Sequence, residues 1–224
     1  MRILFSSENL LLTFLIFTNT NCAYFNTFYN AKQYFEEAEN IRIEKDGKDI
    51  PITAIEKYGK AITNCKRVLE YYPESKHVVE ATLLMAKSLY YKKDYEVAIN
   101  NLTFVYDNGN DSEIEESRYW LALCKWKKGS VQASLNELNL LLDNGNLKKL
   151  QAKYHLSLAN IHNEIGDEDL SLYHLQNAAK FSKGRNEKTT IYNRLAEMAF
   201  NRNDLQLAED SYRNIISNSI SKEN

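Results

Sequence analysis

The sequence predicts an all-α fold, a right-handed superhelical solenoid of about five stacked helical hairpins. A small residue recurs along the 224-residue chain at steps of 37, 36, 37 and 37 residues. Core-type residues follow each small residue at helical spacing. Only two prolines and seven glycines occur, too few for the frequent turns of a β-sandwich or β-barrel. The recurring small residues are Ala61, Ala98, Ser134, Ser171 and Ala208.

Residues 1–21 have the pattern of a leader. Arg2 precedes an apolar stretch that is densest over residues 10–17, and polar residues end it just before Cys22. A basic start, a short apolar core and a polar exit are typical of a secretory signal. The run is shorter than the roughly 20 apolar residues that span a bilayer, and Glu8 interrupts it. We therefore expect a signal peptide over residues 1–21.

The position of Cys22 makes this leader resemble that of bacterial lipoproteins. The resemblance implies that Cys22 is acylated, becomes the first residue of the mature chain and anchors it to a membrane. Asn19 and Asn21 depart from the aliphatic and small residues that are usual at these positions. An uncleaved apolar N-terminus and a soluble secreted protein therefore remain as alternatives.

After the leader, the chain divides into five expected hairpins, over residues 24–72, 73–110, 111–145, 147–183 and 186–217, and a tail over residues 218–224. In each hairpin, the small residue lies early in the second helix. Core-type residues follow it four and seven positions later, which predicts one buried face on that helix. The first set is Cys65, Leu102, Leu138, Leu175 and Tyr212. The second set is Val68, Val105, Leu141, Ala178 and Ile215.

The first helices of the last four hairpins carry a small residue of their own, where adjacent helices must approach to roughly 8–10 Å. These residues are Ala86, Ala122, Ala159 and Ala196. A turn-forming pair separates the two helices of each hairpin. Gly or Asn can take the left-handed conformation that ends a helix, and Asp or Ser can cap the next helix. The pairs are Lys93-Asp94, Gly129-Ser130, Gly166-Asp167 and Asn203-Asp204.

This pattern resembles the tetratricopeptide repeat, and Pro73 lies at the closing proline of that repeat, twelve residues after Ala61. Residues 72–99 further resemble the outer-membrane assembly lipoproteins of the BamD type. The resemblance implies an acylated protein on the periplasmic face of the outer membrane. It also implies a role in the assembly of β-barrel proteins, through binding of other assembly subunits or unfolded segments. The long linker over residues 44–51 departs from that family.

Stacked hairpins are expected to form a concave face lined by their first helices, where repeats of this class bind an extended peptide or a partner's helix. Helical spacing around the small residues predicts exposed candidates on this face. They are Leu83, Lys87, Tyr90, Tyr91, Tyr119, Leu123, Trp126, Asn160, Asn163, Asn193, Glu197 and Phe200. The aromatic members are expected to supply contact area and the asparagines hydrogen bonds to a bound backbone. The alternative is that the rings pack between repeats.

No reaction centre, cofactor or metal site is expected. The net charge of −2 indicates no nucleic-acid partner. The four histidines lack the spacing of three or four residues that a zinc site on one helix needs. The carboxylate pairs Glu36-Glu37 and Glu115-Glu116 are expected on solvated helices, without the apolar pocket that raises a pKa for acid–base chemistry. Cys65 and Cys124 lie on apolar faces and are expected to be buried, although a disulfide between them stays open.

The prediction is therefore a non-enzymatic, lipid-anchored scaffold of the bacterial envelope. Two alternatives remain. One is a periplasmic repeat adaptor for cell division or cell-wall synthesis. The other is the front part of a longer repeat protein, because the last predicted helix still carries Ile215 and Ile216 where a polar capping helix is usual.

Overall fold

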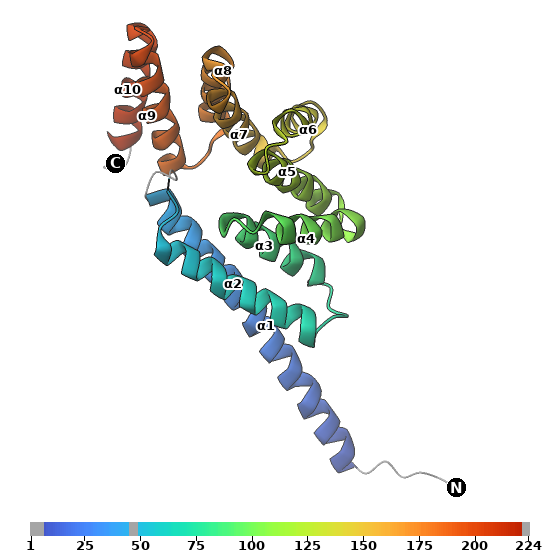
Figure 1. The fold of residues 1–224 in the computed structure, drawn as a ribbon. Helices are drawn as coiled ribbons and strands as arrows, with labels where there is room; N and C mark the ends of the chain where they lie inside the picture. Colours follow the sequence, from blue (N-terminus) through green and yellow to red (C-terminus); the bar gives the residue numbers. More distant parts are fainter. Residues whose placement is uncertain (1–6, 45–48, 221–224) are drawn as a thin grey trace. The chain divides into compact units, whose positions relative to one another are not determined.

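A computed structural model describes the backbone of residues 7–44 and 49–220 and the side chains of residues 26–44 and 49–218. This part of the chain contains ten α-helices, one 3-10 turn and no strand (Figure 1). The all-α prediction is therefore confirmed for the described residues. None of these helices combines the length and the apolar character needed to cross a membrane. The expected acylation site, Cys22, and the expected signal peptide lie outside the residues whose side chains are described.

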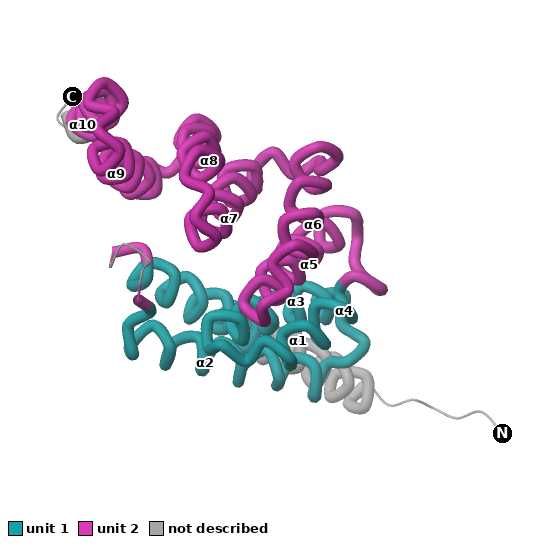
Figure 2. Tube along the Cα trace, turned by 45° about the horizontal axis from the view of Figure 1, so that its top comes forward, with its two compact units in different colours: residues 1–42, 50–105 teal, residues 43–49, 106–224 magenta. Residues whose placement is uncertain are grey.

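The chain forms two compact units, residues 1–42 with 50–105 and residues 43–49 with 106–224 (Figure 2). The helices of the first unit are α1 (Ser7–Glu44), α2 (Ile52–Tyr71), α3 (Val78–Tyr91) and most of α4 (Tyr95–Asn108). Helix α2 packs against α3. An edge-on contact between the rings of Phe35 and Tyr58 joins α1 to α2.

The second unit is a succession of three helical hairpins. Its elements are α5 (Asp111–Lys127), α6 (Val131–Asn144), the 3-10 turn η1 (Lys148–Leu150), α7 (Gln151–Glu164), α8 (Glu168–Phe181), α9 (Arg185–Asn201) and α10 (Leu205–Ile220). The hairpin partners are α5 with α6, α7 with α8 and α9 with α10. Each hairpin also contacts the next, since α6 packs against α7 and α8 packs against α9.

The small residues predicted at helix crossings are buried. The four alanines of the first helices are 0 % exposed, and the five small residues of the second helices are 0 to 4 % exposed. The core-type residues four positions further on are buried in the first four hairpins, but Tyr212 is 47 % exposed. The prediction for Tyr212 is wrong because, within the described residues, no helix follows α10 to cover it.

Four equivalent turns connect the helices of the last four hairpins. Each has one residue in the left-handed region, with φ of 64° at Lys93, 88° at Gly129, 83° at Gly166 and 61° at Asn203. The next residue donates its backbone N–H to a carbonyl five positions back, as Asp94 does to Leu89 at 3.0 Å. This bond satisfies a carbonyl at the helix end. The left-handed conformation predicted for Gly and Asn is confirmed at Gly129, Gly166 and Asn203. The turn predicted at Lys93 is also present, but its left-handed lysine was not expected, because a side chain makes this conformation unfavourable.

The aspartates that follow two of these turns cap the second helices. The Asp167 carboxylate accepts the backbone N–H of Leu170 at 3.2 Å, and Asp204 accepts that of Leu207 at 3.1 Å. Each cap satisfies one of the N–H groups that a helix leaves free at its start. The glycine or asparagine before the aspartate and the capping aspartate therefore act together to reverse the chain.

Cys65 and Cys124 are buried free thiols, as their places on apolar faces predicted. Burial raises the pKa of each thiol to about 12. The thiolate, the reactive form, is therefore suppressed. No disulfide joins these two residues, because both thiols are free and they lie in different units.

Candidate protein-binding surface

The predicted binding residues of the first unit lie on α3, where aromatic rings and cations gather. Leu83 is buried, with 6 % of its surface exposed, so its predicted exposure is wrong. Lys87, Tyr90 and Tyr91 are partly exposed. The Lys87 ammonium lies 5.0 Å from the ring centroid of Phe35 on α1. The three partly exposed side chains are the part of this set that a partner can reach.

Tyr91 also ties α3 to the two preceding helices. Its ring stacks on that of Tyr58 with 4.7 Å between centroids, and the Arg42 guanidinium lies 4.9 Å from its centroid. The Tyr58 hydroxyl donates to Glu39, which also pairs with Arg42 at 2.8 Å. Burial, together with the Glu39 carboxylate, holds the pKa of Tyr58 well above its usual range. Tyr91 therefore has a structural role whether or not it binds a partner.

The predicted binding residues of α5, two aromatic and one aliphatic, are buried, so the expectation that they are exposed is wrong. Tyr119 and Leu123 are each 5 % exposed, and Trp126 is 8 % exposed. The Tyr119 hydroxyl lies 3.0 Å from the Ser157 hydroxyl, and Trp126 donates its indole N–H to Glu164 at 2.6 Å. Both partners belong to α7. These rings are buried because they fill the space between α5 and α7, which is the alternative that the sequence left open.

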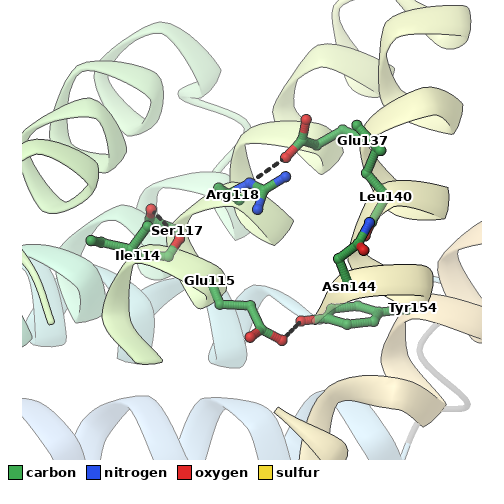
Figure 3. A network of polar contacts seen from close by, with 8 residues as sticks. All are labelled: Ile114, Glu115, Ser117, Arg118, Glu137, Leu140, Asn144 and Tyr154. Carbon is green, nitrogen blue, oxygen red and sulfur yellow. Dashed lines mark hydrogen bonds and ion pairs between the residues drawn. The ribbon is translucent and has the colours of Figure 1, made fainter. Parts of the chain in front are cut away.

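Figure 3 shows a buried carboxylate at the same junction that sequence reasoning missed. Glu115 of α5 is 7 % exposed and was expected on a solvated face. It accepts the backbone N–H groups of Asn146 at 2.7 Å and Leu147 at 2.9 Å, and the Tyr154 hydroxyl at 2.9 Å. A buried carboxylate is tolerated when its oxygens are satisfied in this way. Glu115 thereby links α5 to the chain that leads into α7 and to α7 itself.

Two features of the sequence could have indicated the role of Glu115. The same position holds Val79 one repeat earlier, 36 residues back, and Ala152 one repeat later, 37 residues on. The second feature is Gly145. A Cβ there would lie 2.7 Å from a Glu115 carboxylate oxygen and 2.3 Å from the carbonyl oxygen of Leu141. The glycine is therefore required by close approach, since its φ of −73° is open to any residue.

The remaining predicted residues lie on α7 and α9. We call Asn160, Asn163, Asn193 and Glu197 the polar strip. Asn163, Asn193 and Glu197 are exposed, and Asn160 is partly buried. The Asn160 carbonyl oxygen accepts a bond from the Arg194 guanidinium at 2.6 Å, which joins α7 to α9. Phe200 on α9 is 62 % exposed. Amide side chains that both donate and accept are suited to bonding an extended backbone.

Within the residues whose side chains are described, no three His, Cys, Asp or Glu side chains are arranged to hold a metal ion. Three of the four histidines nevertheless gather in the α7–α8 hairpin.

Comparisons with known proteins agree with the repeat architecture. Residues 53–158 match the YfiO family model, described as an outer membrane lipoprotein. BtubC from P. vanneervenii is similar in structure, with a TM-score of 0.57 and 13 % identity over 89 % of this chain and 92 % of that chain. TTC0263, a thermophilic TPR protein in Thermus thermophilus, has a TM-score of 0.52 and 17 % identity over 84 % of this chain and 91 % of that chain.

MamA from Desulfovibrio magneticus RS-1 is similar as well, with a TM-score of 0.52 and 15 % identity over 87 % of this chain and 98 % of that chain. No curated protein matches this chain. At these identities the solved structures establish the fold alone. The chain is a tetratricopeptide-type helical repeat protein, and its residues 53–158 are similar to an outer membrane lipoprotein family.

Proposed function

We propose that this chain is a non-enzymatic scaffold of the bacterial envelope, anchored through Cys22 to the periplasmic face of the outer membrane. Its role there is to help outer-membrane β-barrel proteins assemble, by binding other assembly subunits or unfolded segments. The observation that carries the proposal is the match of residues 53–158 to an outer membrane lipoprotein family. The leader that ends at Cys22 supports the lipid anchor independently.

The accessible polar and aromatic side chains of the first helices are the proposed contacts. In the first unit these are Lys87, Tyr90 and Tyr91 of α3, which combine a cation with two partly exposed rings. In the second unit they are the four residues of the polar strip. Tyr119, Leu123 and Trp126 are not among the proposed contacts, because they are buried. These three side chains instead pack between α5 and α7, and α7 carries half of the polar strip.

The anchor is tested by labelling cells with a palmitate analogue. Wild-type protein is expected to take up the label, and Cys22→Ala is expected to lose both the label and its membrane association. Cys65→Ala is the matched control, since Cys65 is a buried free thiol, and it should be labelled like the wild type. Label on the Cys22→Ala protein, or none on the wild type, would contradict the anchor.

The partner is tested by affinity capture from detergent-solubilised envelopes. Recovery of a barrel-assembly core subunit supports the proposal, whereas recovery of cell-wall synthases instead would favour the adaptor alternative and overturn it. Asn163→Ala combined with Asn193→Ala should reduce capture, because both amides are exposed and can bond a bound backbone. Lys125→Ala, an exposed change on α5 outside the proposed contacts, is the control and should capture normally.

A further inference from the structure

The third and fourth hairpins use one pair of equivalent positions in different ways. In the third hairpin, Arg118 of α5 donates to Glu137 of α6 at 2.6 Å (Figure 3). One 37-residue repeat later, these positions hold His155 of α7 and His174 of α8. Their Nδ1 atoms lie 2.9 Å apart. A partly exposed ion pair is thus replaced by two histidines that are 7 % and 6 % exposed.

A third histidine completes the cluster. His162 of α7 is 8 % exposed, and its ring stacks on that of His174 with 5.5 Å between centroids. Its Nδ1 is buried and makes no hydrogen bond in the structure. The Asp167 carboxylate lies 3.6 Å from that nitrogen. The aromatic rings of Phe181 and Tyr173 lie against His155 and His174.

The contact between the two Nδ1 atoms limits how many protons the cluster can hold. A hydrogen bond at 2.9 Å needs a proton on one nitrogen and a lone pair on the other. A neutral pair meets this condition, and so does a pair in which one imidazole is protonated. A pair in which both are protonated has two N–H groups facing each other and two positive charges in a buried site. It therefore loses the bond and repels.

Several charged groups on the helices packed against this hairpin are engaged with other partners, whereas a buried guanidinium nitrogen of Arg185, at the start of α9, makes no hydrogen bond. Lys127 of α5 pairs with Glu164. On α9, Arg194 donates to Asn160, and Arg202, the residue that follows α9, pairs with Asp169. Arg118 and Glu137 pair with each other between α5 and α6.

Within the hairpin, Asp167 faces His162, and the Lys180 ammonium lies 5.8 Å from the centroid of the Phe181 ring. Burial lowers the pKa of His174 to about 4, and the charges of His155 and His162 act in the same direction. Burial also lowers the pKa of His155.

We propose that the α7–α8 hairpin is an acid-sensitive element, which stays closed while the His155–His174 pair holds at most one extra proton and opens when the pair takes up a second. A positive charge on His162, whose ring stacks on His174, opposes protonation of the pair. The equivalent Arg118–Glu137 contact contains no histidine, so we expect no such response there.

The sign of the effect follows from proton linkage. In the opened hairpin the histidines titrate near the ordinary pKa of about 6.5, whereas His174 in the closed hairpin titrates at about 4. The open state therefore binds more protons between these values, and the closed state loses stability as the pH falls through that window. Each such histidine raises the opening equilibrium by up to about tenfold per pH unit.

Acid opening of this hairpin also has a consequence that rests on the proposed function. Helix α7 carries Asn160 and Asn163, two residues of the polar strip. A segment bound there would be released at low pH. The measurement below follows the hairpin alone, so it can fail or succeed independently of whether a partner binds.

The test is hydrogen exchange followed by mass spectrometry on the full chain at pH 7.5, 6.0 and 5.0, expressed as protection relative to unstructured peptides at the same pH. We expect the protection of α7–α8 peptides to fall by about tenfold or more between pH 7.5 and 5.0. The α5–α6 peptides, with their Arg–Glu pair, should change by less than about threefold. An equal loss in both hairpins of the wild type would overturn the proposal.

Two variants address the cause. His155→Arg combined with His174→Glu places the pair of the third hairpin in the fourth, and it should abolish the acid response of α7–α8. His174→Gln keeps a hydrogen-bonding side chain but removes one titrating group, and it should reduce the response at least threefold. The His174→Gln variant provides the test of the histidine pair if the double variant does not fold. An unchanged acid response in either folded variant would show that the histidine pair is not the sensor.

Discussion

The α5–α7 and α7–α9 junctions of the second unit join the same kind of helix in different ways. At the first, the Glu115, Tyr119 and Trp126 side chains reach across to α7 and are buried. At the second, Arg194 bonds Asn160 while the neighbouring polar side chains stay exposed.

The repeat register makes this comparison direct. Trp126 and Asn163 occupy equivalent positions 37 residues apart, as do Leu123 and Asn160. The buried aromatic and aliphatic residues hold one junction together, whereas the amides leave the other junction with an accessible polar surface. These two positions of the repeat therefore have no fixed role, because their burial depends on the helix that packs against them.

The largest expected effect is at the buried carboxylate of the first junction. Glu115→Ala leaves two backbone N–H groups and the Tyr154 hydroxyl without their acceptor in a buried site. We expect the free energy of unfolding of the second unit to fall by about 3 kcal/mol, measured by urea titration. The control is Glu197→Ala on the exposed strip, expected to cost less than about 0.5 kcal/mol. Comparable losses in the two variants would break the contrast between the junctions.

A smaller effect is expected from a single indole N–H. Trp126→Phe keeps an aromatic ring in the space between α5 and α7 but removes the donor to Glu164. We expect a loss of about 1 kcal/mol in the same titration. Asn163→Ala, at the equivalent position of the next repeat, should change stability by less than about 0.5 kcal/mol and should weaken partner capture instead. A stability loss for Asn163→Ala as large as that for Trp126→Phe would show that both positions serve packing.

The smallest expected effect is on stability, at the left-handed turn residue of the second hairpin. Lys93 holds φ at 64° in a turn where two other hairpins have glycine. Lys93→Gly should stabilise the chain by about 0.5–1 kcal/mol, because it removes the cost of a left-handed side chain. Thermal unfolding should give a higher midpoint for this variant and a lower one for Gly129→Ala, the reciprocal control. A destabilised Lys93→Gly protein would show that the lysine side chain contributes more than its backbone conformation costs.

Much of this architecture was predictable because its determinants are local. The small residues at Ala86 and Ala159 lie where helices cross, and only a small side chain permits the close approach. The left-handed turns at Gly129 and Gly166 depend on a residue without a Cβ, which the sequence displays directly. At Lys93 the repeat spacing alone predicts the turn, because the residue is neither Gly nor Asn.

The binding surface was only partly predictable. Helical spacing assigns Tyr119, Leu123 and Trp126 to one side of α5, but spacing cannot say whether a neighbouring helix covers that side. The covering groups, Ser157 and Glu164, lie 38 residues further on. Glu115 was missed for a related reason: a carboxylate on a helix is usually solvated, and its three donors come from a distant part of the chain.

The number of hairpins to be expected, the small residues at helix crossings and the positions where the chain turns are readable from the sequence, since they follow from side-chain size and backbone conformation over a few residues. Which of the equivalent positions became packing and which became surface emerged only from the folded chain. So did the gathering of three histidines from two helices in one buried site. Those outcomes depend on contacts between helices, where the energy of a side chain is set by its partner rather than by its place in the repeat.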